Sequence, residues 1–198
     1  MSNPARHASA CEPLRAATPQ PLVAVQGQRG PLLFSLGAGP SSSMLADRLV
    51  PEAVAARRSM RDKDRLFTEL ATLVADAMPS ISAEEVETEL REREAVFTTA
   101  MGHGVAIPHA TIAAAPRTFM GVMTLTTPVD FGEDADGPVD VCFCLVGPPS
   151  DRAAHLHLLA HIAGAVTESD LLDRMRAANT TVALLDVLGS PRLPTSRE

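Results

Sequence analysis

The chain has 198 residues, of which 45% are hydrophobic and 21% are charged, and its formal net charge is −7 at pH 7. Its length corresponds to one domain of ordinary size with some excess chain. The negative charge argues against a nucleic-acid-binding surface, and no apolar run reaches the length of a membrane span. Arg6 is not followed by the apolar core and cleavage site of a signal peptide. We therefore expect a cytoplasmic protein that binds no nucleic acid and does not insert into a membrane.

The first part of the sequence lacks a sustained hydrophobic period. Residues 1–43 contain a QGQRGP stretch, a GAGPSSS run and prolines at positions 4, 13, 19, 21, 31 and 40. This composition predicts a disordered or loosely ordered extension. The folded pattern begins at Met44, and one interpretation is that the chain starts there. We expect a folded domain over residues 44–188 and a polar tail over residues 189–198.

Strand and helix signals alternate after this point. Residues 54–57 predict a short strand, and an apolar face predicts a helix over about residues 62–77. Ser59 is placed to cap this helix, and Ser82 begins a capping-box pattern that opens a second helix ending near Arg93. The apolar face of the first helix consists of Leu66, Leu70, Leu73, Val74 and Ala77.

The second half of the chain continues the alternation. Residues 119–125 and 139–146 predict two strands. The Asp136-Gly137 turn signal in the GEDADG loop between them favours an antiparallel pair. Helices are predicted over about residues 152–166, 169–178 and 181–188.

The cysteines are Cys11, Cys142 and Cys144, an odd number without metal-type spacing. Cys142 and Cys144 lie two residues apart in a predicted strand, and hence on one of its faces. We interpret them as core thiols rather than as a disulfide or a redox pair.

One stretch, REAVFTTAMGHGVAIPHA, combines several features of a ligand site. Gly102 and Gly104 bracket a loop where the backbone can approach a ligand closely, because glycine has no Cβ and accepts positive φ. Residues 105–107 predict a very short buried strand, and Pro108 ends it and constrains the residue that follows. His109 is therefore a candidate nucleophile, although a histidine after a proline is also typical of an ordinary turn.

The predicted helix over residues 152–166 carries the sequence HLHLLAH. At about 100° per residue, His155 shares the apolar stripe with Leu158, whereas His157 and His161 lie on the opposite face. A core histidine with satisfied hydrogen bonds is the alternative interpretation of His155. His157 and His161 are spaced like a metal-binding pair, but no cysteine or third ligand lies near them in the sequence.

These blocks together resemble a known family. RE followed by TT, then GHGVAIPHA, and later HLHLLAHIA are similar to the EIIA domain of the fructose, mannitol and nitrogen branch of the bacterial phosphotransferase system. The similar region runs from about Met44 to Leu188. The resemblance implies an α/β fold, in which a mixed β-sheet is flanked by helices in a single EIIA-like domain of the mannitol type.

The resemblance also implies roles for individual residues. The histidine of the PH dipeptide, His109, would accept a phosphoryl group from the phosphocarrier HPr or its nitrogen-branch relative. Arg93 matches the family's active-site arginine, and His155 matches its second histidine. Thr99 falls in the family's Ser/Thr-Thr pair, where Thr98 replaces the commoner serine.

His103 departs from the family pattern, because the residue between the two glycines is usually not histidine. We expect His103 to face solvent. The alternative is a position near the site, from which its ring would alter the pH response.

The residue types in these positions suit phosphoryl transfer. A neutral imidazole nitrogen can attack phosphorus near pH 7, and the phosphoryl group in flight needs in-line positioning and charge stabilisation. We expect Arg93 to supply a charged fork, and His155 a ring N–H, to the phosphoryl oxygens. Thr99 would add a hydroxyl, and the loop of Gly102 and Gly104 would add backbone donors. No metal, nucleotide or other cofactor is required, and the sequence contains no P-loop.

Three functional classes remain open. The chain shows neither a membrane domain nor a phosphorylated B domain, so we expect a stand-alone EIIA. It could be a regulator of the nitrogen-branch type, whose phosphorylation state controls protein partners, or a carrier that passes phosphate to a separate EIIB in sugar uptake. The third class is an EIIA-like module that only binds partners. The unfused chain favours regulation, and the retention of Arg93, Thr99, His109 and His155 disfavours the third class.

Overall fold

The computed structural model describes residues 45–167 and 169–189. The predicted extension over residues 1–43, the alternative start at Met44 and the tail from residue 190 lie outside these ranges. In the described part, five strands form one sheet in the order β1-β4-β5-β2, and β3 also pairs with β5. The strands are β1 (Leu49–Arg58), β2 (Val105–Ala106), β3 (His109–Thr111), β4 (Phe119–Val129) and β5 (Val139–Gly147).

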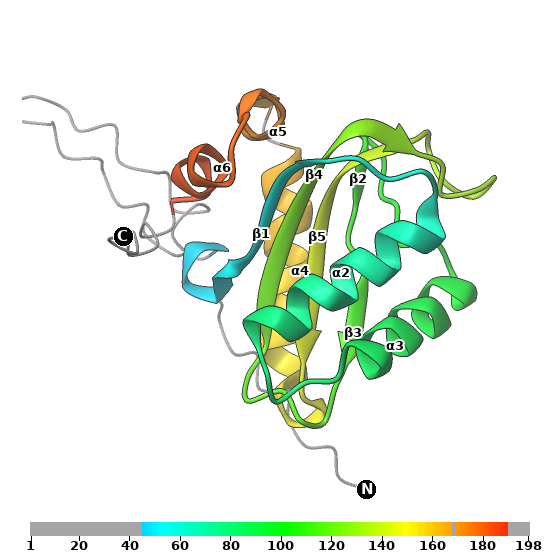
Figure 1. The fold of residues 1–198 in the computed structure, drawn as a ribbon, viewed down its shortest axis with the longest axis vertical. Coiled ribbons are helices and arrows are strands. Elements are labelled where there is room, and N and C mark those ends of the chain that lie inside the picture. The colour runs from blue at the N-terminus through cyan, green and yellow to red at the C-terminus, as the bar shows by residue number, and fades with distance from the viewer. Residues whose placement is uncertain (1–44, 168, 190–198) are drawn as a thin grey trace, which may run out of the picture. The chain divides into compact units, whose positions relative to one another are not determined.

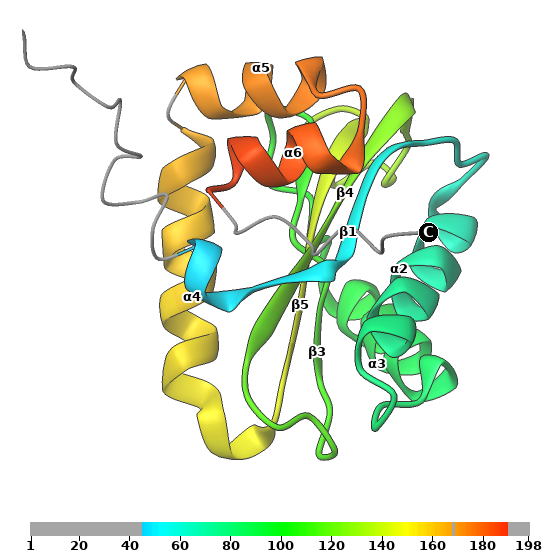
Figure 2. The same cartoon turned by 60° about the vertical axis from the view of Figure 1, so that its left-hand side comes forward.

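Helices cover both faces of this sheet (Figures 1 and 2). On one face lie α2 (Lys63–Ala77) and α3 (Ala83–Val96). On the other face lie α4 (Arg152–Val166), α5 (Ser169–Ala177) and α6 (Thr181–Val187), with the short 3-10 helix η1 (Pro149–Asp151) before α4. The predicted α/β fold with a mixed sheet flanked by helices is confirmed.

The strand directions make the sheet mixed. β4 and β5 pair antiparallel, with Met120 opposite Leu145, as the turn between them predicts. β1 runs parallel to β4, and both β2 and β3 run parallel to β5. The interrupted edge made by β2 and β3 carries the end of the motif of residues 93–110, whereas the motif begins in the last turn of α3.

β1 is much longer than the predicted strand over residues 54–57. Its pairing with β4 shifts register between Leu49 and Val54. Pro51 and Glu52 fall in this interval and break the apolar pattern. A proline without an N–H is tolerated in an edge strand, so the strand continues through a position where the sequence pattern stops.

The predicted helices are present, with one wrong cap. α2 is capped by Asp62, whose side chain accepts a hydrogen bond from the Arg65 N–H, rather than by Ser59. Ser82 caps α3 by accepting from Glu85 N–H, as predicted. α3 continues to Val96, three residues past the predicted end at Arg93.

The sheet separates two apolar layers. Cys142 and Cys144 are both buried in the layer against α2 and α3, together with Leu66 and Leu70 of α2. Burial raises the pKa of both thiols, that of Cys144 to about 12, so they are protonated at neutral pH. The interpretation as core thiols is therefore confirmed for these two residues, whereas Cys11 lies outside the described residues.

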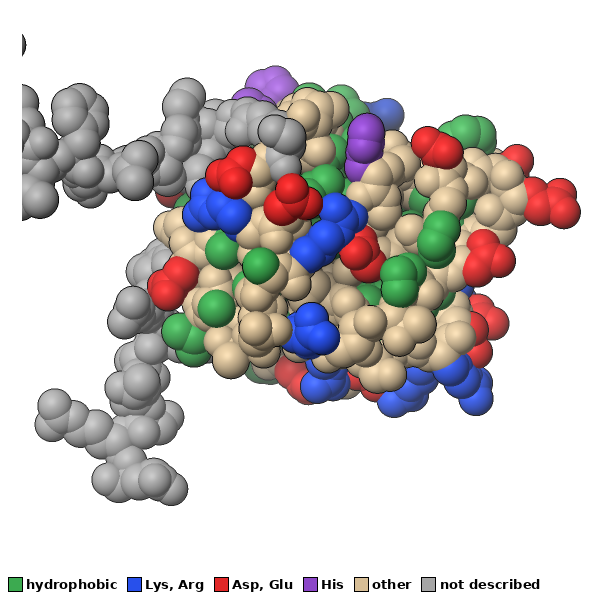
Figure 3. Space-filling view, turned by 90° about the horizontal axis from the view of Figure 1, so that it is seen from above, with side chains coloured by type: hydrophobic (Ala, Val, Ile, Leu, Met, Phe, Trp, Pro, Cys, Tyr) green, Lys and Arg blue, Asp and Glu red, His purple; other side chains and the backbone are tan. Residues whose placement is uncertain are grey.

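The face drawn in Figure 3 carries charged side chains of both signs. On the face seen in Figure 3, basic and acidic side chains lie next to one another, and hydrophobic side chains form small groups. Within the described residues, no helix is both long enough and apolar enough to cross a membrane.

Candidate functional site

Both ring nitrogens of His109 have hydrogen-bond partners. Nδ1 lies 2.8 Å from the carbonyl oxygen of Ile107, and Nε2 lies 2.9 Å from Nε of Arg93. An arginine Nε–H can only donate, so Nε2 must accept with its lone pair. The proton of the neutral ring is therefore on Nδ1, where it is donated to Ile107. This arrangement leaves Nε2 as the basic, nucleophilic atom.

The backbone around His109 differs in one respect from the prediction. β2 stops after Ala106, but the edge resumes at His109, which pairs with Leu145 of β5. Pro108 lacks an N–H, but its carbonyl oxygen accepts from the Leu145 N–H at 2.9 Å. Pro108 therefore interrupts the edge strand without ending it, and His109 lies in strand β3 rather than in a loop.

His155 lies in the first turn of α4 and faces His109. The two ring centroids are 5.4 Å apart with an interplanar angle of 61°. His155 is half-buried, and Leu158 and Ile162, which share its stripe, are buried. The predicted orientation of His155 toward the core side of the helix is confirmed.

The pKa values of both histidines lie below the ordinary value. Burial is the main cause for His109, and the nearby Arg93 charge lowers its pKa further, whereas the Ile107 hydrogen bond and the Glu94 charge act in the opposite direction. Burial likewise lowers the pKa of His155, with a further contribution from His109 and an opposing one from Asp151. Both rings are thus neutral at pH 7, as a nitrogen nucleophile requires.

Arg93 is held in the last turn of α3. Besides contacting His109, its guanidinium donates from Nη1 to the carbonyl oxygen of Phe97 at 2.9 Å. Phe97 is 65% exposed and Val96 is 82% exposed, so the arginine reaches His109 from an open, apolar rim. The structure therefore brings Arg93, His109 and His155 together from α3, β3 and α4.

Thr99 is near this group, but its hydroxyl points elsewhere. Its backbone N–H and its Oγ1 both donate to Oε2 of Glu94, at 2.8 and 2.6 Å. Thr99 is buried, with 7% exposure. Because the hydroxyl proton is committed to Glu94, Thr99 does not present the free donor that we expected for a phosphoryl oxygen.

The Gly102–Gly104 loop is not at the site. β2 starts with Val105 opposite Val141, whereas His109 lies opposite Leu145, four residues further along β5. At about 3.3 Å per residue, this is a separation of roughly 13 Å. The chain between the loop and His109 is extended, so the loop lies too far away to supply donors to a phosphoryl group on His109. The expectation that it does so is therefore wrong.

The two glycines are needed at the tip of a hairpin instead. Their φ angles are +86° and +76°, and a Cβ on Gly104 would lie 2.6 Å from both Arg176 and Asp140 side-chain atoms. Arg176 of α5 donates to Asp140 at 2.8 Å from two nitrogens and also to the carbonyl oxygen of His103 at 2.6 Å. His103 itself is exposed, as expected.

His157 and His161 line a hollow of about 300 Å³, together with Asp47 and Arg48. His109 is not among its lining residues. Among the residues that the structure describes, no group of three histidine, cysteine or acidic residues is arranged to hold a metal ion.

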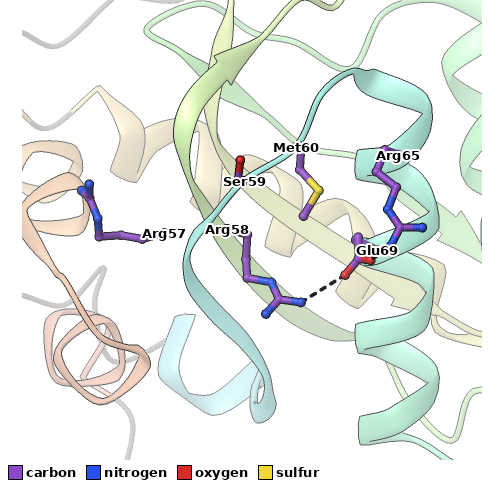
Figure 4. Close-up of a pocket in the computed structure, with 6 residues that line it drawn as sticks. All are labelled: Arg57, Arg58, Ser59, Met60, Arg65 and Glu69. Carbon is purple, nitrogen blue, oxygen red and sulfur yellow. Dashed lines mark hydrogen bonds and ion pairs between the residues drawn. The ribbon is translucent and has the colours of Figure 1, made fainter.

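A second hollow is a groove of about 250 Å³ at the end of β1 (Figure 4). Arg58 donates to Glu69 at 3.2 Å, and Arg65 contacts the same carboxylate. Arg57 points away from this group in the close-up. The groove also includes Ser59 and Met60.

Sequence reasoning missed two residues beside the site. Glu94 accepts hydrogen bonds from Thr98 and Thr99, and Lys63 of α2 donates to it at 3.3 Å. The one available signal was an acidic residue at the end of a helix, where the macrodipole disfavours a negative charge.

The sequence is similar to a known protein family. A family model described as "Phosphoenolpyruvate-dependent sugar phosphotransferase system, EIIA 2" matches residues 49–190. The chain belongs to this EIIA family. The matched region contains Arg93, His109 and His155, and the predicted family resemblance is confirmed.

Individual relatives match along most of the chain. The chain is 35% identical to a nitrogen regulatory protein of Pseudomonas aeruginosa over 126 residues, 64% of this chain and 82% of the relative. It is 34% identical to a nitrogen regulatory protein of Bradyrhizobium diazoefficiens over 148 residues, 74% of this chain and 95% of the relative. The crystal structure of the nitrogen regulatory protein IIA-Ntr from Neisseria meningitidis superposes with a TM-score of 0.66 at 25% identity, covering 73% of this chain and 99% of that one.

The position of the glycine loop gives a first prediction. Gly104→Ala should lower the free energy of unfolding by about 1–3 kcal/mol, because the new Cβ has no room and the backbone φ is strained for alanine. The His109 ring resonances should stay unchanged in NMR spectra, since the tip is remote from them. Gly137→Ala is the control, because Gly137 also has a positive φ but no atom within 4 Å of its Cβ position. Displacement of the His109 resonances in Gly104→Ala would contradict this placement.

The pKa directions give a second prediction. Because the folded pKa values of His109 and His155 lie below the ordinary 6.5 or so, the unfolded chain binds more protons at acidic pH. Their contribution to stability is therefore present above about pH 6.5 and is lost as pH falls through the lowered folded values. Urea unfolding from pH 8 to 5 should show a steeper loss of stability in the wild type than in a His109→Gln, His155→Gln double variant. If stability fell equally steeply with pH in both proteins, the two rings would not be held neutral in the folded protein.

Proposed function

We propose that the protein is a cytoplasmic phosphoryl carrier whose His109 accepts a phosphoryl group from HPr or a nitrogen-branch HPr-like phosphocarrier. One observation carries the proposal: the Nε2 lone pair of His109 is fixed toward Arg93, with the ring proton held on the opposite nitrogen. Membership of the EIIA family supports the reaction class. No metal or cofactor takes part in the proposed transfer.

The proposed step is an in-line displacement between two imidazoles. Nε2 of His109 forms a bond to phosphorus while the P–N bond of the donor phosphohistidine breaks, and the donor ring recovers that electron pair. The charge that develops on the His109 ring is stabilised at Nδ1–H by the Ile107 carbonyl oxygen. The Nδ1 proton stays in place, so the transfer needs no separate base.

Arg93 must move during this step. In the structure its Nε–H donates a hydrogen bond to the Nε2 lone pair of His109, and this lone pair has to attack phosphorus. We infer that the guanidinium leaves Nε2 as the donor docks, and then binds the oxygens of the arriving phosphoryl group. A guanidinium offers a planar fork of donors that suits phosphate oxygens. His155, whose ring faces His109, supplies the second donor in this proposal.

We infer that the carrier serves regulation. The relatives that match along most of the chain are named nitrogen regulatory proteins. In this role the phosphorylated and unphosphorylated forms bind a target protein with different affinities. The alternative, transfer to a separate EIIB in sugar uptake, has the support of the family's description as part of a sugar phosphotransferase system. Transfer of label from His109 to a purified EIIB would favour that alternative.

Labelling tests the proposed acceptor. Incubation with labelled phosphoenolpyruvate, Enzyme I and HPr should give a phosphoramidate that is lost in acid and kept in alkali. His109→Ala should abolish the label, and His155→Ala should slow its appearance, because a hydrogen bond to a charged group of about 1.5–3 kcal/mol is lost. His157→Ala is the matched control from the other face of α4 and should label like the wild type. Label that persists in His109→Ala would overturn the assignment.

Arg93→Lys provides a separate test. Lysine keeps the charge but loses the planar fork, so it cannot form the bidentate hydrogen bonds that a guanidinium makes to two phosphoryl oxygens. The initial rate of labelling should fall while the far-ultraviolet circular dichroism and the unfolding midpoint stay close to the wild type. A wild-type rate in Arg93→Lys would remove Arg93 from the transfer.

A further inference from the structure

A continuous series of hydrogen bonds connects α2 to the ring of His109. Lys63 Nζ donates to Oε1 of Glu94 at 3.3 Å. Oε2 of Glu94 accepts from the N–H and the hydroxyl of Thr99. The carbonyl oxygen of Thr99 accepts from the Ile107 N–H at 3.0 Å, and the carbonyl oxygen of Ile107 accepts from Nδ1 of His109 at 2.8 Å.

Glu94 is the centre of this series. Its side chain is 6% exposed and receives four donors: Lys63 Nζ, the Thr98 hydroxyl, and the N–H and hydroxyl of Thr99. A carboxylate that is buried to this extent is tolerated only when it is paired and hydrogen-bonded. The donors therefore fix the position of Glu94, and Glu94 in turn fixes the backbone at Thr99.

Lys63 is itself held in one place. It donates to the carbonyl oxygen of Phe131 at 2.9 Å, and its ammonium lies 5.4 Å from the centre of the Phe131 ring. It is the only lysine in the sequence, although arginines are frequent. An ammonium is a compact charge with three donors, which suits a small, half-buried position between a carboxylate and an aromatic face.

We propose that Glu94 is a positioning residue of the phosphoryl-transfer site and that Lys63 acts through it, by holding the Thr99 backbone that orients Ile107 and the ring of His109. This inference rests on the proposed function. It gives Thr99 a role that differs from the expected hydroxyl donor, because both Thr99 donors serve Glu94. The ring of His109 then presents Nε2 only while this series is intact.

A second set of contacts between the same helices provides the control. Arg91 of α3 pairs with Asp64 of α2 and, at 2.8 Å, with Glu87 of its own helix. Within the part of the chain that the structure describes, no hydrogen bond or ion pair joins these residues to Thr99 or His109. A general loosening of α2 against α3 would therefore follow from Arg91→Met as well as from Lys63→Met, but a loss of ring positioning would follow only from the latter.

The experiment compares Lys63→Met, Lys63→Arg, Glu94→Gln, the Lys63→Met, Glu94→Gln double variant and Arg91→Met in the full chain. Long-range ¹H–¹⁵N NMR correlations of the His109 ring report its tautomer without any donor protein. The proposal predicts a lower Nδ1–H population in Lys63→Met and Glu94→Gln and no change in Arg91→Met. Lys63→Arg should recover the population only in part, because it keeps the charge but its guanidinium is larger than the ammonium. The double variant should be no worse than Glu94→Gln alone, because Lys63 acts through Glu94.

The pH titration of the ring adds a readout that loss of packing would not produce. The charged groups facing His109 are Arg93 and Glu94 on α3, and His155 faces it from α4. Because the Glu94 charge opposes the lowering of the His109 pKa, Glu94→Gln should lower that pKa further, whereas Arg91→Met should leave it unchanged. A His109 pKa that rises in Glu94→Gln would overturn the proposal.

The rate of labelling separates this inference from the proposed function. Misplacement of a reacting group can cost up to about a hundredfold in rate, so Lys63→Met and Glu94→Gln should label between about ten and a hundred times more slowly than Arg91→Met. Wild-type tautomer and rate in Glu94→Gln would overturn the inference. If the wild type itself took no label, the proposed function would fail, and the NMR result alone would still decide whether Glu94 positions the ring.

Discussion

The ring of His109 is held between an acceptor and a donor, and the rest of the site depends on this constraint. The Ile107 carbonyl oxygen takes the Nδ1 proton, and Arg93 points a donor at Nε2. Together they select one neutral tautomer and one ring orientation. Burial keeps the ring neutral at pH 7 by lowering its pKa. Without either partner the ring could rotate or change tautomer, and the nucleophilic atom would not be defined.

The layered fold explains how distant parts of the sequence satisfy this constraint. α3 lies on one face of the sheet and α4 on the other, and the interrupted edge formed by β2 and β3 lies beside β5. The end of α3 brings Arg93, and the start of α4 brings His155, to the same strand residue. Pairing of the edge with β5 continues past Pro108 through the Pro108 carbonyl oxygen. The carbonyl oxygen of the preceding residue, Ile107, turns toward the His109 ring.

Those parts of the site that depend on local pattern could be predicted from the sequence. The helical period places His155 on the core side of α4. The family resemblance, rather than any local period, indicates Arg93 as a site residue, and it strengthens the case for His109 after its strand and proline. The Lys63–Glu94 contact joins residues 31 positions apart, and no local period reports such a pair. The predicted proximity of the Gly102–Gly104 loop to His109 was wrong for a different reason. The chain between them is extended, so residues close in sequence lie far apart in space. The predicted strand over residues 54–57 was too short, because Pro51 and Glu52 interrupt the apolar pattern of β1 although its pairing with β4 continues.

We propose that Nε2 of His109 is the atom that carries the phosphoryl group. ¹⁵N and ³¹P NMR of the protein labelled with ¹⁵N-histidine and phosphorylated through HPr would identify the phosphorylated nitrogen. We expect phosphorus coupled to the Nε2 resonance of His109, with Nδ1 still protonated and hydrogen-bonded to Ile107. Phosphorus coupled to Nδ1 of His109, or to a nitrogen of any other histidine, would contradict it.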